Sequence, residues 1–168
     1  MPETLASQFN PTKILVPIDF SPSSEAALRA AMGLAEQFHA EIYLLHAIPM
    51  LAITTGMEFP TTFYPAEEFL EGAREQAKRK LQETVSLLSG AGIEANYSIE
   101  VGSDVVGSIL MVMHREQTDL IVISTHGMSG WRPIVFGSIA EKVVKLVEGP
   151  LLLLRSVKST AVKPVTKS

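Results

Sequence analysis

Residues 119–144 read DLIVISTHGMSGWRPIVFGSIAEKVV and carry the clearest structural signal in the chain. Its β-branched apolar run at 120–123 predicts a buried strand. The strand ends in a loop that carries Gly127 and Gly130 and closes at Gly137-Ser138, where a helical pattern begins. This order presents backbone N–H groups and a serine hydroxyl to a phosphate. Glycine suits such a loop because it accepts positive φ and lets the backbone approach a ligand closely.

Strand and helix patterns alternate along the rest of the chain. We expect strands at 13–18, 42–48, 95–101, 120–123 and 151–154, and helices over about 26–38, 69–88, 105–113 and 138–147. The near-continuous apolar character of 42–48 is typical of a parallel strand covered on both faces. The alternation therefore predicts an α/β fold, an open parallel sheet with right-handed crossovers and helices on both faces.

Residues that follow the predicted strands are the first candidates for a site. In open α/β sheets, ligands bind beyond the carboxyl ends of the strands, where the strand order reverses. Asp19, Ala47 and the loop at 124–138 each follow a predicted strand. We therefore expect them to line one crevice.

Composition narrows the classes of function. The 168 residues correspond to one domain, 46% of them are hydrophobic, and the net charge of −4 lacks the basic footprint of nucleic-acid binding. The absence of cysteine excludes disulfides, thiolate metal sites and a cysteine nucleophile. There is no signal-peptide pattern and no apolar run of the ~20 residues that a membrane helix needs. A cytoplasmic protein without a membrane partner is expected.

Three segments lack a periodic pattern. We expect residues 1–10 to be a flexible N-terminus and residues 158–168 to be a disordered tail, with the folded domain at 11–157. The segment at 49–65 is longer than most loops inside a domain, which is typical of a lid, a binding loop or a disordered insert.

Three stretches resemble the universal stress protein family. They are ILVPIDFS at 14–21, LLHAI at 44–48 and the glycine loop, and the resemblance covers about residues 10–156. The nucleotide-binding branch of that family carries Gly, two residues, Gly, nine residues, Gly, then Ser or Thr. Gly127, nine residues and Gly137-Ser138 fit its second half, whereas Ser124 stands at the first glycine. A register starting at Gly127-x-x-Gly130 leaves only six residues before Gly137, so we prefer the first register.

The resemblance implies a fold, a ligand and an assembly. The fold is a Rossmann-like, five-stranded parallel sheet with strand order 3-2-1-4-5. The ligand is ATP or another adenine nucleotide, bound in the crevice. The assembly is a homodimer formed through the last strand, Leu151–Leu154. An apolar strand at a sheet edge also exposes unpaired N–H and C=O groups that invite pairing with another chain.

The candidate phosphate contacts lie where the glycine loop meets its helix. The amides of Gly137, Ser138 and Ile139 and the Ser138 hydroxyl would face an anion at a helix N-terminus, although Ser138 can instead simply cap the helix. Gly127 is interpreted as a close-approach glycine. Ser124 adds a Cβ and a hydroxyl that either bond a ribose or crowd it.

The remaining candidates rest mainly on the resemblance. It places Pro17 and Asp19 at the nucleotide, and it assigns the adenine edge to the backbone of Ala47. The Asp19 carboxylate can accept from an amino group or ribose hydroxyls, or help to hold Mg²⁺ or Mn²⁺; otherwise it is a turn residue. Arg132 either touches phosphate or is solvated, and His126 matches a histidine frequent in the family.

The other histidines carry no functional assignment. None of the histidine spacings is that of metal ligands, and His46, in an apolar strand, is expected to be a hydrogen-bonded core residue.

The leading hypothesis is a non-enzymatic, ATP-binding module of a stress response. A slow ATPase or an autophosphorylating enzyme ranks second, because a Walker Gly-x-x-x-x-Gly-Lys-Ser/Thr pattern is absent and no general base stands beside the phosphate site. No catalytic residue is therefore assigned. A third possibility is a protein-interaction member that has lost nucleotide binding, which the departure at Ser124 keeps open.

Overall fold

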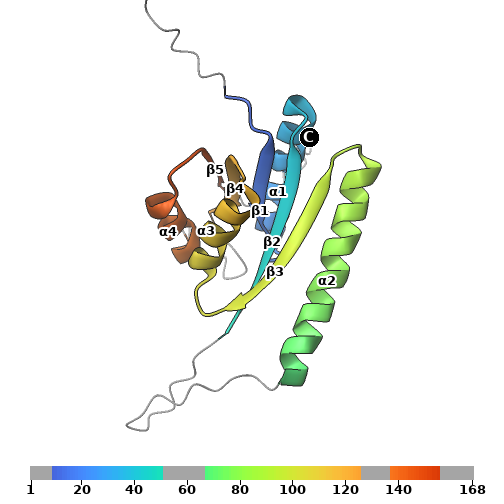
Figure 1. The fold of residues 1–168 in the computed structure, drawn as a ribbon, viewed down its shortest axis with the longest axis vertical. Coiled ribbons are helices and arrows are strands. Elements are labelled where there is room, and N and C mark those ends of the chain that lie inside the picture. The colour runs from blue at the N-terminus through green and yellow to red at the C-terminus, as the bar shows by residue number, and fades with distance from the viewer. Residues whose placement is uncertain (1–8, 51–66, 126–136, 156–168) are drawn as a thin grey trace, which may run out of the picture.

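The computed structural model describes residues 9–50, 67–125 and 137–155. Within them the elements alternate as β1 (Lys13–Pro17), α1 (Pro22–Phe38), β2 (Glu41–Pro49), α2 (Glu67–Gly90), β3 (Ala95–Gly102), α3 (Val105–Glu116), β4 (Leu120–Ser124), α4 (Ser138–Leu146) and β5 (Leu151–Leu154). The strands form one five-stranded parallel sheet in the order β3-β2-β1-β4-β5. The predicted fold class and strand order are confirmed (Figure 1).

The strand order reverses at β1. The chain first builds outward from β1 to β2 and β3, and then returns to add β4 on the other side of β1 and β5 beyond it. Ile14 of β1 consequently pairs with Ile42 of β2 on one side and with Leu120 of β4 on the other. The carboxyl ends of β1, β2 and β4 meet at this switch point, where sheets of this kind bind their ligands.

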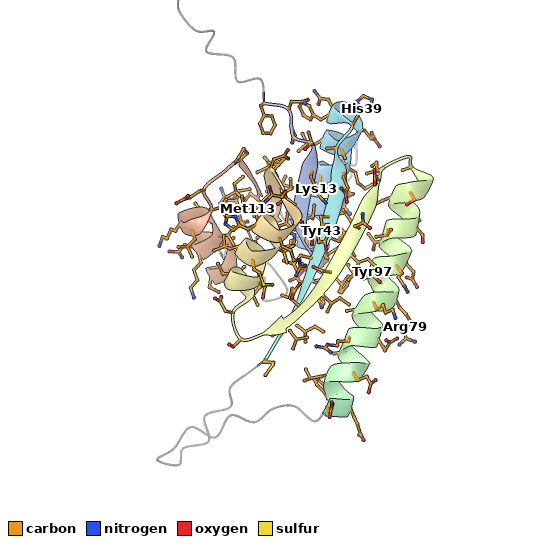
Figure 2. All side chains as sticks on the ribbon, viewed as in Figure 1. Lys13, His39, Tyr43, Arg79, Tyr97 and Met113 are labelled. Atoms are coloured by element: carbon orange, nitrogen blue, oxygen red, sulfur yellow. The ribbon has the colours of Figure 1, made fainter. Side chains whose placement is uncertain are left out.

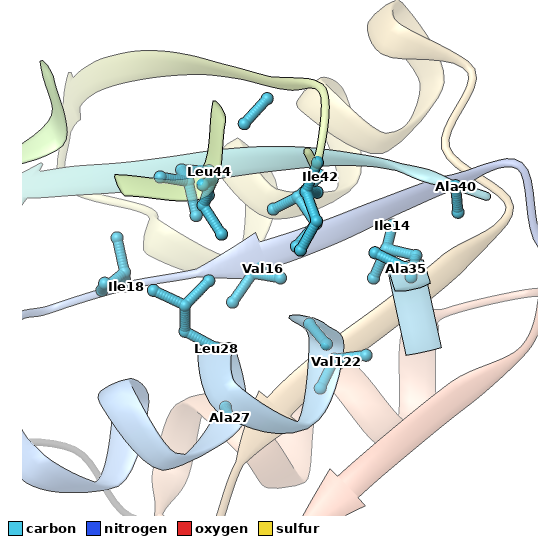
Figure 3. Close-up of a cluster of buried hydrophobic side chains, with 14 of the residues drawn as sticks. Ile14, Val16, Ile18, Ala27, Leu28, Ala35, Ala40, Ile42, Leu44 and Val122 are labelled. Carbon is cyan, nitrogen blue, oxygen red and sulfur yellow. The ribbon is translucent and has the colours of Figure 1, made fainter. Parts of the chain in front are cut away.

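Two hydrophobic layers hold the helices on the sheet. Alternate side chains of β1 point to opposite faces, so Ile14 and Val16 belong to one layer and Leu15 to the other. The first layer packs under α1 and α2 and is drawn in Figure 3. Tyr97, labelled in Figure 2, packs against it from β3. The second layer lies under α3 and α4, so both faces are covered.

Local chemistry explains where the helices begin and end. Ser21 is the N-cap of α1, where its Oγ accepts a hydrogen bond from the Ser24 amide at 3.2 Å, and Pro22 follows in the first turn. The residues that follow α1 and α3, His39 and Gln117, are their C-caps. Both adopt the left-handed conformation, with φ of 56° and 54°. α2 ends at Gly90, and Gly92, with φ of 79°, turns the chain toward β3.

One large apolar residue near the start of α2 is exposed to solvent. Phe69 has 69% of its surface accessible. The buried positions of α2 begin only at Ala77, so the first turns of the helix lie beyond the part that packs on the sheet.

Three expectations fall wholly or largely outside the described residues. They concern the flexible N-terminus, the tail at 158–168 and the long loop at 49–65, of which only the first two residues are described. In the part of the chain that is described, no helix combines the length and the apolar character needed to cross a membrane.

Candidate functional site

A cavity of about 650 Å³ opens at the carboxyl edge of the sheet. Its walls come from the ends of β1, β2 and β4, the first turn of α4, and side chains of α2 and α3. This volume lies within the ~300–1,000 Å³ of typical small-molecule sites. The cavity also sits at the switch point of the strand order, so its place and size both suit a ligand.

All the sequence candidates that fall in described residues line this cavity. They are Pro17, Asp19, Ala47, Ser124, Gly137, Ser138 and Ile139. The other candidates, His126, Gly127 and Arg132, lie outside the described residues. Parallel strands bring their carboxyl ends to one edge, which is why residues so far apart in the sequence meet here.

The corner between β4 and α4 differs in one respect from the prediction. The Gly137 amide was expected to face a phosphate, but it donates to the Thr125 carbonyl oxygen at 2.7 Å. The Thr125 amide in turn donates to the Leu154 carbonyl oxygen at 2.8 Å. These bonds fix the loop's end to the sheet. Gly137 is also the N-cap of α4, so the cap role considered for Ser138 is wrong.

The first turn of α4 still offers donors to the cavity. The amides of Ser138, Ile139 and Ala140 have no carbonyl partner within the helix, because the first intrahelical bond runs from Glu141 to the Gly137 oxygen at 3.0 Å. All three residues line the cavity. Their amides and the helix dipole favour an anion at this end by about 0.3–2 kcal/mol.

Asp19 has the turn role that the sequence allowed. Its Oδ1 accepts hydrogen bonds from the Ser21 amide, at 3.0 Å, and from the Ser21 hydroxyl. Ser21 caps α1, so the carboxylate orients the residue that starts the helix. The same side chain lines the cavity, and a ligand there would meet a carboxylate already held in place.

Sequence reasoning missed an aromatic and cationic wall. The rings of Phe20 and His46 lie 4.6 Å apart at an angle of 35°, and the Lys80 ammonium lies 4.7 Å from the centre of the Phe20 ring. Phe20 has φ of 60°, a left-handed conformation that costs roughly 1–2 kcal/mol. All three residues line the cavity. His46 is hydrogen-bonded as expected, through Nδ1, but it is half-buried and not part of the core.

A weak signal for this wall was present in the sequence. Lys80 follows Ala73 and Ala77 at the spacing of one helix face, and Phe20 and His46 directly adjoin the candidates Asp19 and Ala47. Among the described lining residues, Lys80 and Asp19 carry the formal charges. No group of three or more His, Asp or Glu residues in the described ranges has the geometry to hold a metal ion.

Comparison with known proteins agrees with the fold and with the sequence resemblance. The model of the universal stress protein family matches residues 11–155, and the chain therefore belongs to this family. It is 30% identical to universal stress protein YxiE of Bacillus subtilis over 147 residues, which cover 85% of this chain and 98% of YxiE.

Solved structures show the same architecture. That of MJ0577 from Methanocaldococcus jannaschii is 29% identical, with a TM-score of 0.74 over 88% of this chain and 98% of MJ0577. A universal stress protein from Archaeoglobus fulgidus, solved in complex with dAMP, is 24% identical, with a TM-score of 0.57 over 84% of this chain and 96% of its own.

Proposed function

We propose that the cavity binds an adenine nucleotide, with ATP as the leading candidate, and that the protein acts as a nucleotide-dependent regulatory module. The observation that carries this proposal is the convergence of candidates from β1, β2, β4 and α4 on one cavity at the switch point. The complex of a relative of the same fold with dAMP supports the choice of ligand.

The proposed pose follows the chemistry of the walls. The phosphates would lie at the first turn of α4, where the amides of Ser138 and Ile139 have no intrahelical partner. The ribose would lie near Ser124 and Asp19, and the base near Ala47. Mg²⁺ or Mn²⁺ would enter with the phosphates, because a hard cation of this kind binds phosphate oxygens together with one or two carboxylates.

A regulatory role is favoured over catalysis by the sequence of the loop. It lacks the lysine of a Walker pattern, which would stabilise charge on a transferred phosphate. A slow ATPase is the alternative enzyme. Turnover measured with and without Mg²⁺ or Mn²⁺ separates the two, since a binding module retains ATP intact.

The assembly and the setting belong to the same proposal. β5 is one of the two edge strands of the sheet, and its Leu152 is 36% exposed. We place the dimer interface on this strand because its outer edge offers backbone groups that a second copy can pair. A cytoplasmic location and a part in a stress response complete the proposal.

The decisive test is nucleotide binding by the protein and by Gly137→Val. Gly137 has φ of −55° and ψ of 143°, a conformation open to any residue, so the variant should fold. The branched side chain would crowd the phosphates, and ATP affinity should fall at least about tenfold, or ~1.4 kcal/mol, by calorimetry.

Gly102→Val is the matched control. Gly102 lies at the end of β3, outside the cavity, and a Cβ there meets no atom within 4 Å. It should bind ATP as the unmodified protein does. If folded Gly137→Val binds ATP as tightly as the control, the phosphate assignment is wrong. If the unmodified protein binds no adenine nucleotide, the proposed function itself is wrong.

A further inference from the structure

Backbone pairing between β1 and β2 stops at the edge of the cavity. The last paired residues are Pro17 and Leu45, after which the Ile18 amide donates to the Leu45 carbonyl at 2.8 Å. The Ile18 carbonyl, one residue beyond the end of β1, lies 2.8 Å from Nδ1 of His46. The imidazole thus replaces a backbone hydrogen bond at the point where the strands end.

This contact fixes the protonation pattern of the ring. A carbonyl oxygen can only accept, so Nδ1 of His46 must carry the hydrogen. In the neutral imidazole the other nitrogen, Nε2, is then an acceptor with a lone pair. In residues 9–50, 67–125 and 137–155, no donor is bonded to Nε2. His46 lines the cavity, which is where a partner for this atom would come from.

The surroundings make His46 a selective acceptor. Its ring is held on one side by Phe20, whose own ring carries the Lys80 ammonium at 4.7 Å. Gln76, four residues before Lys80 on α2, also lines the cavity. Its side-chain amide offers both a donor and an acceptor. An imidazole fixed at Nδ1 and packed against a ring cannot turn to exchange its acceptor for a donor.

We infer that His46 determines base specificity by accepting a hydrogen bond from the exocyclic amino group of a 6-aminopurine. This inference rests on the proposed nucleotide site. The amino group carries two hydrogens, and the Ala47 backbone would take only one of them. A 6-oxopurine places an acceptor oxygen opposite Nε2 and leaves both lone pairs without a hydrogen, so the site rejects hypoxanthine nucleotides.

The test compares ATP with ITP. ATP carries an amino group at C6 of the purine, whereas ITP carries a carbonyl oxygen at the same position. His46→Asn retains an amide at the Nδ1 position for the Ile18 carbonyl but removes the acceptor at Nε2. We expect the variant's preference for ATP over ITP to fall at least about fivefold. It would lose the hydrogen bond to the amino group of ATP, and it would no longer place an unpaired acceptor opposite the oxygen of ITP. His46→Gln, whose amide reaches the Nε2 position, should retain more of the preference.

The control is His114→Asn, an exposed position of α3 outside the cavity, which should leave the preference unchanged. Binding is measured by calorimetry on variants whose thermal unfolding shows them to be folded. An unmodified protein that binds ATP and ITP equally, or an unchanged preference in folded His46→Asn, overturns the role of His46 and leaves the nucleotide site standing. Absence of binding to either nucleotide removes the site and this inference together.

Discussion

Ser124 ends β4 at the wall of the cavity, where it pairs in register with Leu154 of β5. It is half-buried and lies one residue before Thr125, whose carbonyl holds the Gly137 amide. Its Cβ therefore stands close to the place where the proposed ribose meets the phosphates. In the proposed pose this single small side chain would limit how closely the ligand approaches the end of the strand.

Replacing Ser124 by glycine tests whether its side chain crowds the ligand. If it does, Ser124→Gly should retain or improve the affinity for ATP, because the Cβ that the nucleotide must pass is removed. Ser103→Gly, at an exposed position outside the cavity, corrects for the added backbone freedom. A marked loss of affinity specific to Ser124→Gly would instead identify the hydroxyl as a ligand contact.

At the scale of elements, the start of β4 is tied to β1 by one carboxylate. Asp119 Oδ2 accepts from the Thr12 amide at 2.9 Å and from its hydroxyl at 2.8 Å, and Oδ1 accepts from the Lys13 amide at 3.1 Å. In return the Asp119 amide donates to the Lys13 carbonyl at 3.0 Å. These bonds set the register that carries both strand ends to the cavity.

The pKa of Asp119 gives this tie a pH dependence. Burial by itself raises the pKa, but the hydrogen bonds from Thr12 and Lys13 outweigh burial and hold it below the ordinary value of 3.8. A lowered folded-state pKa means that the stabilisation is complete well above pH 3.8 and is lost as the pH falls through the folded value.

Asp119→Asn should therefore lower the free energy of unfolding near neutral pH by about 1 kcal/mol, allowing for solvent screening. The difference from the unmodified protein should shrink as the pH falls below the ordinary aspartate value, because the native carboxylate becomes protonated. Urea denaturation at neutral and acid pH measures this. Asp104→Asn, at an exposed side chain that makes no capping bond, is the matched control for the loss of one carboxylate. A difference for Asp119→Asn that does not change with pH would contradict the assignment.

At the scale of the whole molecule, the two edges of the sheet differ. β3 is covered by α2 along one face, and its apolar residues alternate with polar ones. β5 is short and consists of leucines, of which Leu151 and Leu153 pack on the layer under α3 and α4. Leu152 lies on the other face of the sheet and is exposed, and in the proposed assembly this edge would meet the second copy.

Leu152→Lys should shift the protein toward monomer in sedimentation experiments. A charge at the proposed two-fold contact would face its own copy, and like charges brought together oppose association. Leu87→Lys, on α2 at a position that is 75% exposed, adds the same charge away from β5 and should leave the assembly unchanged. An unmodified protein that is monomeric at tens of micromolar would refute the dimer.

The α/β class of this protein could be predicted from the residue pattern alone. Apolar runs such as 42–48 and 120–123 predicted buried parallel strands. A strand that is covered on both faces has no solvent-facing side, so its residues need not alternate between apolar and polar. The alternation with helices predicted the α/β class, and the resemblance supplied the strand order. Asp19, Ala47 and Ser124 could be placed at one crevice because parallel strands end at a common edge, whereas Pro17 was selected through the resemblance.

Only the tertiary structure decided which atoms of these residues face the cavity. The Gly137 amide donates to the Thr125 carbonyl. Three residues from separate parts of the chain also meet, namely Phe20 after β1, His46 of β2 and Lys80 of α2. No periodic pattern encodes such meetings, since they depend on how α2 packs across β2 and β3. Hydrogen bonds and ring contacts act over a few ångströms, so their partners exist only once the packing has set those distances.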